Sequence, residues 1–454
     1  MSAPDVVVVG AGFAGLSAAS ALAEAGLRVL VLESRPRLGG RATSFADRET
    51  GELVDNGQHV LFGCYRETFR FLERIGASEH VRRQPRLMVP FVDWLGRRTE
   101  LKCPPLPAPL HLLAAVLDWD GLPWRERLSV LRVVGPLASA RRELARRGRV
   151  STSPPDLTVS DWLRQQRQGP RISQWLWEPL AVAALNQSPE HASAAPFLRV
   201  LAEMFGSDPS AAAIGLPIRP LNLMYAEPAR VYVEARGGLV RTRAQARLVC
   251  DDRGVTVVAV GGEALTASRV IVAVPWFDLP GLFPGGPPDD LAETAAAAGA
   301  LESMPIVTVN LWYDRPVMDE PFVGLPGRAM HWVFDKRIAF GGEASHLSLV
   351  ASGAEALVGL DNRSLVDRAA QEVEDALPRA RRGRLLRGTV VRERRATFSL
   401  APARSTRPGT RTGIRGLYLA GDWIDTGLPG TIESAVVSGH MAAESLLDRE
   451  RADR

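Results

Sequence analysis

The fold of this chain is decided by the stretch Asp5-Val6-Val7-Val8-Val9-Gly10-Ala11-Gly12-Phe13-Ala14-Gly15. Its apolar run is typical of a buried parallel strand and leads directly into a Gly-x-Gly-x-x-Gly turn. An Ala/Leu-rich helix is expected from there to Ala25, and Gly26 stands where a helix-terminating glycine belongs. Arg28 to Leu32 predicts a second strand, which ends at Glu33. This order of strand, turn, helix, strand and acid predicts a dinucleotide-binding unit.

The three glycines of the turn have different mechanical roles. Gly10 permits the tight turn, Gly12 leaves room for a pyrophosphate, and Gly15 lets the helix pack closely on its strand. The first helical turn, which contains Phe13-Ala14, presents backbone N–H groups and a partial positive charge to the phosphates. Glu33 is placed to accept hydrogen bonds from a ribose diol, and its charge would repel a 2′-phosphate. We therefore expect these residues to contact the dinucleotide.

A second glycine motif follows the second strand, in Ser34-Arg35-Pro36-Arg37-Leu38-Gly39-Gly40-Arg41. Two adjacent glycines give a ligand close access to the backbone, and the guanidinium of Arg41 can clamp a diphosphate. The motif resembles the one that follows the acidic residue in the large FAD-dependent family of amine oxidases and carotenoid desaturases. This resemblance favours FAD over NAD, and it implies cofactor contacts at Ser34, Arg35, Gly39, Gly40 and Arg41.

A third glycine motif lies near the C-terminus. Leu417 to Asp422 predicts a strand, and Gly427-Leu428-Pro429-Gly430-Thr431-Ile432-Glu433-Ser434-Ala435 opens a helix. Gly430 permits close approach, the helix N-terminus supplies N–H groups, and Asp422 can bind a ribityl hydroxyl. In the resembling FAD family this region holds the flavin end of the cofactor, which implies contacts at Gly421, Asp422, Gly430, Thr431 and Ile432.

The composition is that of a globular chain of 454 residues, 46% of them hydrophobic and 23% charged. This length predicts more than one subdomain. A net charge of only +4 argues against nucleic acid as a partner. Cys64, Cys103 and Cys250 have neither the spacing of a disulfide framework nor that of a metal site, so no metal is expected and a reducing cytoplasm is favoured. The first strand begins at residue 5, which leaves no space for a signal peptide.

The order of elements predicts an α/β fold built from separated segments. Nucleotide-type strands and helices occur in residues 1–85, 221–275 and 411–454, whereas residues 86–220 and 276–410 have other patterns. An interrupted nucleotide domain of this kind is the organisation of the same FAD family. The resemblance implies a Rossmann-like FAD-binding domain of the GR2 type and a discontinuous α+β substrate domain with a mostly helical cap.

The hydrophobic pattern predicts the main elements within these segments. A hairpin is expected from Phe91 to Leu101, with its turn at Gly96. After the proline-rich stretch 103–109 a helix is expected from about Leu110, a further one runs to about Arg147, and residues 151–224 are mostly helical. Strands are predicted at Leu239–Val249, Val255–Val260 (followed by a turn at Gly261-Gly262), Arg269–Pro275, Val307–Trp312, His331–Phe334 and Leu347–Ala351, and helices at Ala226–Ala235 and Ser364–Leu377.

A polar cluster, Asp55-Asn56-Gly57-Gln58-His59, distinguishes this chain within the FAD family. Together with the 427–435 motif and Tyr225-Ala226-Glu227-Pro228-Ala229-Arg230, it resembles the hydroxysqualene dehydroxylases, also described as squalene-associated FAD-dependent desaturases of hopanoid pathways. The resemblance covers most of the chain and is thinnest over about 100–215. It implies that the cofactor is also contacted by Gly57, Gln58, His59 and Ala246.

The resemblance implies a reductive reaction. Reduced FAD would deliver a hydride to an allylic alcohol of a C30 isoprenoid, hydroxysqualene, which loses water to give squalene. Hydroxide is a poor leaving group, so a proton donor is needed near the departing oxygen. His59 is the first candidate because imidazole titrates near neutrality, and Asp55 is the next. The alternatives are a His59 side chain hydrogen-bonded to flavin or backbone, and an Asp55 carboxylate in a turn or helix cap.

Other functions are compatible with the same motifs. A carotenoid or isoprenoid desaturase uses the same scaffold in the oxidative direction, and a flavin-bearing lipid carrier would bind FAD without turnover. An amine oxidase is disfavoured, because those enzymes usually place an aromatic residue where Leu428 and Pro429 stand. The sequence does not indicate which electron donor would reduce FAD.

The apolar helices raise the question of membrane contact. No apolar run reaches the ~18–20 residues needed to span a bilayer. The 104–117 and Leu128–Leu137 helices, with Trp119, Trp124 and nearby arginines, suit contact with a membrane surface, although amphipathic helices packed on the core have the same pattern. The chain is therefore expected to be cytoplasmic, either soluble or peripheral at the inner face of the cell membrane.

Overall fold

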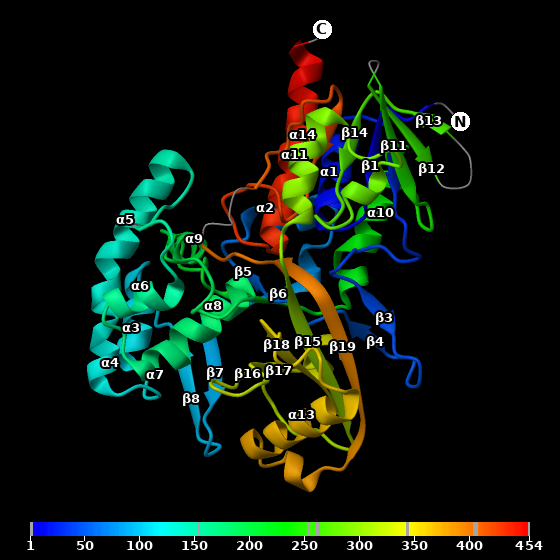
Figure 1. Ribbon diagram of the computed structural model, residues 1–454. Helices are drawn as coiled ribbons and strands as arrows, with labels where there is room; N and C mark the ends of the chain where they lie inside the picture. Colours follow the sequence, from blue (N-terminus) through cyan, green and yellow to red (C-terminus); the bar gives the residue numbers. More distant parts are fainter. Residues whose placement is uncertain are drawn as a thin grey trace.

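A parallel sheet joins distant parts of the chain in the computed structural model, which describes residues 3–152, 154–251, 254–259, 264–341, 345–402 and 407–452. The sheet has five strands in the order β10-β2-β1-β14-β20 (Figure 1). The four-residue runs of β1 and β2 are wholly buried, as expected for parallel strands covered on both faces. The α/β fold class is therefore confirmed. The strands are β1 (Val6–Val9), β2 (Val29–Leu32), β10 (Leu239–Arg241), β14 (Val270–Val272) and β20 (Leu417–Leu419).

Two long helices that pack on this sheet also pack closely on each other. A Cβ atom on Gly439 of α14 would overlap the backbone oxygen of Ala14 and the hydroxyl of Ser17 on α1. The missing side chain therefore lets the helix of the C-terminal motif lie against the helix of the N-terminal motif. The helices around the parallel sheet are α1 (Phe13–Glu24), α2 (Arg66–Arg74), α10 (Glu227–Glu234) and α14 (Ile432–Ala452).

The second large sheet has seven strands in the order β19-β15-β18-β17-β16-β7-β8. Helix α13 (Asn362–Ala376) packs on one face, over a core that includes Val307, Val333 and Leu349 (Figure 1). Alternate residues on the same strands, such as Ile306 and Phe334, point to the opposite face and line a cavity. The strands are β7 (Met88–Val92), β8 (Arg98–Lys102), β15 (Ser303–Tyr313), β16 (Phe322–Gly324), β17 (Trp332–Asp335), β18 (Ser345–Ser352) and β19 (Leu385–Phe398).

The structure confirms the predicted hairpin and most predicted strands, corrects one of them and adds a strand that was not predicted. Leu239–Val249 is not one strand, because Arg243 has a φ of +53° and breaks it into β10 and β11 (Ala246–Asp251). The long strand β19 was not predicted, since Arg392 to Arg395 reads as an exposed charged run. The predicted Val255–Val260 strand is β12 (Gly254–Ala259), and the turn expected at Gly261-Gly262 lies outside the described residues.

The helical part agrees with the prediction at its start and differs from it further on. The helix expected from about Leu110 begins at that residue, after a proline-rich stretch, whereas the Leu128–Leu137 helix is broken at Val130. Among the described residues, no helix is both long enough and apolar enough to cross a bilayer. The helices are α3 (Leu110–Asp118), α4 (Trp124–Ser129), α5 (Leu131–Arg147), α6 (Val159–Gln165), α7 (Pro170–Ile172), α8 (Glu178–Leu185) and α9 (Ala194–Met204), with a π-helical turn at Ser173–Trp177.

Shorter elements connect these parts. Three small sheets pair β3 with β4, β9 with β5 and β6, and β12 with β11 and β13. Their bounds are β3 (Ser44–Ala46), β4 (Leu53–Asp55), β5 (Leu61–Phe62), β6 (Val81–Arg83), β9 (Ile214–Pro217) and β13 (Ala264–Thr266). The remaining helices are α11 (Asp289–Gly299) and α12 (Lys336–Phe340), a π-helical turn at Asn222–Ala226, and 3₁₀ turns at Ser78–His80, Pro280–Leu282 and Ala380–Arg382.

Candidate functional site

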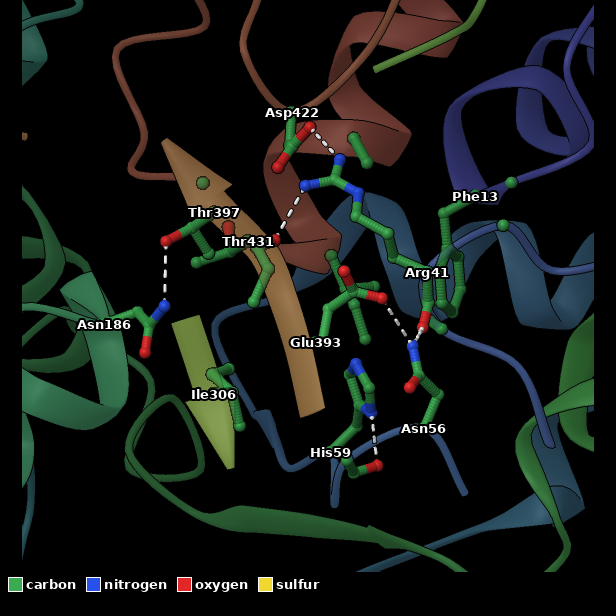
Figure 2. Close-up of a pocket in the computed structure, with 18 of the residues that line it drawn as sticks. Phe13, Arg41, Asn56, His59, Asn186, Ile306, Glu393, Thr397, Asp422 and Thr431 are labelled. Carbon is green, nitrogen blue, oxygen red and sulfur yellow. Dashed lines mark hydrogen bonds and ion pairs between the residues drawn. The ribbon is translucent and has the colours of Figure 1, made fainter. Parts of the chain in front are cut away.

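A cavity of about 630 Å³ is lined by both large sheets and by the helical part. One end is formed by the glycine motifs, and the other is walled by apolar side chains. Figure 2 shows residues from distant parts of the chain, among them Phe13, Asn56, Glu393 and Asp422, around the same space. The cavity therefore gathers the three glycine motifs and the 55–59 cluster into one site.

The glycine-rich end begins at the carboxyl end of β1. Gly10 has a φ of +104°, and a Cβ atom there would lie 2.5 Å from the backbone oxygen of Ala273. A Cβ on Gly15 would overlap the backbone oxygen of Gly10, so this glycine serves the packing of helix on strand. Gly12, by contrast, takes the N-cap position of α1 and faces the cavity, where a Cβ would meet only Gly40, at 3.9 Å. The space in front of Gly12 is thus kept open for a ligand.

Glu33 stands at the end of β2, as predicted, and is 6% exposed. Its carboxylate accepts hydrogen bonds from the backbone N–H groups of Ala11 and Arg35, each at 2.9 Å. These bonds fix the carboxylate at the cavity wall and compensate the burial of its charge. The geometry fits a carboxylate that receives ribose hydroxyls.

The Gly39-Gly40 turn is held by an aromatic residue. The Tyr225 hydroxyl donates to the backbone oxygens of Gly39, at 2.8 Å, and Ala42, at 3.1 Å. Its ring stacks on Phe13 with 3.6 Å between ring centroids. Tyr225, which lies within the π-helical turn at Asn222–Ala226, thus joins the second glycine motif to the first.

Arg41 connects the N-terminal and C-terminal motifs. Its guanidinium pairs with Asp422 at 2.5 Å (Figure 2). It also donates to the Ala396 oxygen at 2.7 Å and lies over the Trp276 ring. Asp422 itself is 5% exposed. The diphosphate clamp expected of Arg41 and the ribityl contact expected of Asp422 stay predictions, but both groups line the cavity.

Glu433 has a different role from its neighbours in the C-terminal motif. Its carboxylate accepts the backbone N–H groups of Glu67 and Thr68 and the Thr68 hydroxyl, at the start of α2. Burial raises the pKa of this carboxyl, while the Thr68 hydrogen bonds lower it. Glu433 therefore caps a helix, and the cavity wall at this point is made by Gly430, Thr431 and Ile432.

A buried ion pair supports the 55–59 cluster. The Lys336 ammonium donates to Asp55, at 2.7 Å, and to the side-chain oxygen of Gln58, at 2.5 Å, and both charged side chains are 3% exposed. Asp55 also accepts the Ser44 hydroxyl at 2.6 Å and the backbone N–H of Leu221 at 3.2 Å. Asp55 lies behind the cavity wall, where its carboxylate is bound by these donors, so the expectation that it protonates a substrate stays a prediction that this geometry does not favour.

His59 lines the cavity, but its hydrogen bond restricts its chemistry. Its Nδ1 lies 3.0 Å from the backbone oxygen of Gly57, which can only accept, so the proton of a neutral ring is on Nδ1 and Nε2 is an acceptor. Burial lowers the pKa of His59, and Lys336 and Arg41 act in the same direction. The neutral ring is thus favoured at neutral pH, and it is better suited to accept a hydrogen bond than to release a proton.

The structure brings nearly all the predicted contacts together. Gly15 and Asp55 lie behind the wall, and the others line the cavity, including Ala246 on β11. The predicted residues that line it are Gly10, Gly12, Phe13, Ala14, Glu33, Ser34, Arg35, Gly39, Gly40, Arg41, Gly57, Gln58, His59, Ala246, Gly421, Asp422, Gly430, Thr431 and Ile432.

Sequence reasoning did not identify the residues of the apolar end of the cavity or several polar residues inside it. The apolar wall combines the second sheet, the β7–β8 hairpin and the segment around α8: Val89, Phe91, Leu101, Leu176, Leu180, Ala183, Phe322, Trp332, Phe334 and Val350. The polar residues that were missed include Asn56, Asn186, Glu393 and Thr397. Glu393 and Thr397 could be placed at the cavity only once β19 had been recognised as a strand.

Known proteins resemble the chain over almost its entire length. The family model described as flavin containing amine oxidoreductase matches residues 13–447. The chain belongs to this family. Its cofactor is FAD, and it is a flavin-dependent oxidoreductase. The glycine cradle fits this cofactor, since the side chain missing at Gly12 leaves the backbone at the N-terminus of α1 open to the cavity, and Gly10 permits the tight turn before it.

Two relatives and one solved structure show how similar the chain is to individual known proteins. The hydroxysqualene dehydroxylase of Rhodopseudomonas palustris is 31% identical over 98% of this chain and 99% of its own length. The zeta-carotene desaturase of Arabidopsis thaliana is 25% identical over 98% of this chain and 85% of its own length. A solved structure of an oxidoreductase from Methanosarcina mazei has a TM-score of 0.74 and 17% identity, covering 97% of this chain and 99% of that one, and it supports the fold.

Replacing Gly12 with Ala should weaken FAD binding without unfolding the protein. The new methyl group meets the protein only at 3.9 Å, and φ is −84°, but it projects into the space kept for the cofactor. We expect the dissociation constant of FAD to rise about tenfold or more, which corresponds to roughly 1.4 kcal/mol. Flavin absorbance per protein after dialysis measures this. Gly285→Ala, where no atom lies within 4 Å of the added Cβ, is the control, and equal flavin content in both variants would contradict the expectation.

Replacing Lys336 with Met should destabilise the protein strongly. The substitution leaves the Asp55 carboxylate buried without its cation, which costs about 3–5 kcal/mol. The free energy of unfolding in urea measures the loss. Lys102, the other lysine of the chain, is exposed, so Lys102→Met should change stability by less than about 0.5 kcal/mol. The double variant Asp55→Asn/Lys336→Met should recover part of the loss, and a double variant as unstable as the sum of the two single variants would contradict the pairing.

Proposed function

We propose that this oxidoreductase reduces hydroxysqualene to squalene with loss of water, in isoprenoid or hopanoid biosynthesis. The observation that carries the proposal is the continuity of the cavity, which runs from the glycine cradle into an apolar wall of leucine, valine and aromatic residues. A C30 hydrocarbon chain requires such a wall, because its transfer from water is favourable in proportion to the apolar area buried. The similarity to the hydroxysqualene dehydroxylase of Rhodopseudomonas palustris supports the substrate class.

The residues of the cavity have separate roles in this proposal. Bound FAD in its reduced form would supply the hydride. The three glycine motifs, Glu33 and Asp422 would hold the cofactor, and the apolar wall would exclude water from the reacting carbon. The Nε2 atom of His59 would accept a hydrogen bond inside the cavity and so orient the substrate hydroxyl or a flavin group.

A desaturase acting in the oxidative direction is the second candidate. It is favoured by the similarity to the zeta-carotene desaturase of Arabidopsis thaliana, and the same apolar wall would suit its substrate. An amine oxidase is the weaker alternative, since Leu428 and Pro429 stand where an aromatic residue is usual in those enzymes. The two isoprenoid reactions differ in the flavin state that reacts, which makes them separable by experiment.

We also propose that the chain divides by task. Residues 1–85, 221–275 and 411–454 would bind FAD, and residues 86–220 and 276–410 would bind the substrate. The five-stranded parallel sheet draws its strands from the first three ranges, and the seven-stranded sheet draws its strands from the other two. Residues from both groups of ranges line the cavity. FAD would therefore occupy the part lined by the first group, and the substrate the part lined by the second.

A membrane surface is a further proposed partner. The α3–α5 face, defined here as Leu110, Leu117, Trp124, Leu128, Leu131 and Val134, exposes large apolar side chains. Exposed Arg125 and Arg132 lie in the same helices, and Arg125 stacks on Trp124, which is 65% exposed. Cations beside apolar groups suit an anionic lipid surface. Trp119, expected at this surface, is 1% exposed and bonded to Thr99, so it packs in the core instead.

Product analysis tests the proposed reaction. The purified protein, reduced anaerobically and mixed with hydroxysqualene, should form squalene while its flavin reoxidises. The oxidised protein mixed with squalene, phytoene or zeta-carotene should leave the flavin oxidised, because the proposed reaction needs a reduced cofactor. Reduction of the flavin by one of these hydrocarbons, with a new double bond in the product, would favour the desaturase and refute the dehydroxylase.

Co-sedimentation with vesicles tests the proposed membrane contact. The protein should bind vesicles containing an anionic phospholipid better than zwitterionic ones, and the triple variant Trp124→Gln/Leu128→Gln/Leu131→Gln should lose about tenfold or more in partitioning, since each side chain contributes about 1 kcal/mol or more. Val231→Gln/Leu386→Gln, which alters exposed apolar residues elsewhere, is the matched control. Equal binding of the wild type and the triple variant would refute the contact through this face.

A further inference from the structure

Glu393 is a carboxyl group in the cavity that the sequence motifs do not assign to any task. It lies on β19, opposite Ile306 on β15, and the register between the two strands shifts between Glu393 and Thr397. Glu393 and Thr397 both line the cavity together with Ile306, whereas Arg395 is exposed. Figure 2 shows the Glu393 side chain between Thr431 and Arg41 on one side and His59 on the other. It therefore stands where the cofactor end of the cavity meets the apolar end.

The hydrogen bonds of Glu393 stabilise a negative charge on its carboxyl group only weakly. One carboxylate oxygen accepts the Asn56 side-chain amide at 2.9 Å, and the other accepts the backbone N–H of Arg395 at 3.3 Å. Both donors are neutral. Asn56 in turn donates to the backbone oxygen of Arg41 at 2.8 Å, so it ties the carboxyl to the second glycine motif. In the part of the chain that the structure describes, the ion pairs of cavity carboxylates involve Asp422, not Glu393.

The other acidic side chains among the described residues of the cavity already interact with backbone N–H groups or arginines. Glu33 is bound by two backbone N–H groups at the glycine end, and Asp422 is paired with Arg41. Burial raises the pKa of Asp278, whereas the positive charges of Arg395, Arg35 and Arg41 lower it. This carboxyl lines the cavity close to these arginines. These positions suit the cofactor better than the substrate.

Among the described residues that line the cavity, the two other proton carriers, His59 and Tyr65, are poor acids. The His59 ring has its Nδ1 proton engaged by Gly57, and its Nε2 is an acceptor. Burial raises the pKa of the Tyr65 phenol far above neutrality, so it holds its proton. A group that must release a proton to a leaving hydroxyl is thus needed, and a carboxylic acid that faces an apolar chamber meets that need.

We propose that Glu393 is the catalytic acid of the reductive reaction, and that it protonates the departing oxygen of an allylic alcohol. This inference rests on the proposed function. The Glu393 O–H bond breaks and its proton joins the substrate oxygen; the C–O bond breaks, and its electron pair leaves with water. The carbon takes a hydride from the reduced flavin, which becomes oxidised, and Glu393 is left as a carboxylate that solvent reprotonates. When the C30 chain fills the apolar end it excludes water, which favours the neutral carboxyl before the reaction begins.

Two variants separate this role from a structural one. Glu393→Gln keeps an oxygen that can accept from Asn56 but cannot release a proton, whereas Glu393→Asp keeps the acid on a shorter side chain. In single turnovers of the anaerobically reduced protein with hydroxysqualene, Glu393→Gln should form squalene about 10²–10⁴-fold more slowly, and Glu393→Asp should retain part of the rate. FAD content and melting temperature should match the wild type. Glu100→Gln, at an exposed carboxyl on β8, is the control.

A second measurement does not depend on turnover. Hydroxysqualene binding to the oxidised protein, followed by calorimetry in two buffers of different ionisation enthalpy, should take up about one proton near neutral pH, and Glu393→Gln should take up none. Equal proton uptake or equal squalene formation by the wild type and Glu393→Gln would overturn the role of Glu393 and leave the proposed function standing. A wild type that binds hydroxysqualene but forms no squalene would instead overturn the proposed function.

Discussion

Close backbone contact around the first helix is the constraint on which the rest of the structure depends. Gly15 lets α1 lie on its own strand, β1, and Gly439 lets α14 lie on α1. Gly10 lets the turn between β1 and α1 approach Ala273. A side chain at any of these positions would push backbone apart rather than displace a flexible neighbour. The contact brings the N-termini of α1 and α14, which are far apart in the sequence, to the same end of the cavity. Together they form a site for a long, negatively charged cofactor.

The floor of the site is stabilised by a charge pair that the protein buries rather than exposes. Lys336 comes from α12 and Asp55 from β4, so their contact joins α12 to the N-terminal segment that carries Gln58 and His59. Such a pair stabilises a protein only when its remaining hydrogen bonds are satisfied, and Ser44 and Leu221 supply them here. The same donors hold the Asp55 carboxylate in place, so this polar residue of the motif serves the geometry of the site.

The cavity combines opposite environments over a short distance. At the glycine end, backbone N–H groups and Arg41 favour negative charge, whereas the wall that includes Phe334 and Leu180 is apolar. An apolar substrate on this wall would therefore lie beside the charged cofactor without occupying the cofactor site. Glu393 lines the same cavity, close to His59, Thr431 and Arg41.

The sequence by itself determined the cofactor end of this protein. The functions of Gly10, Gly12 and Glu33 follow from local geometry, because a turn, a helix terminus and a strand end need only neighbouring residues to form. The second half of the site was decided by tertiary structure. Glu393 lies in an arginine-rich stretch, and only its pairing with β15 in the seven-stranded sheet turns it toward the cavity. Asp55 and Lys336 are 281 positions apart, and long-range pairing of this kind leaves no local pattern from which it could be predicted.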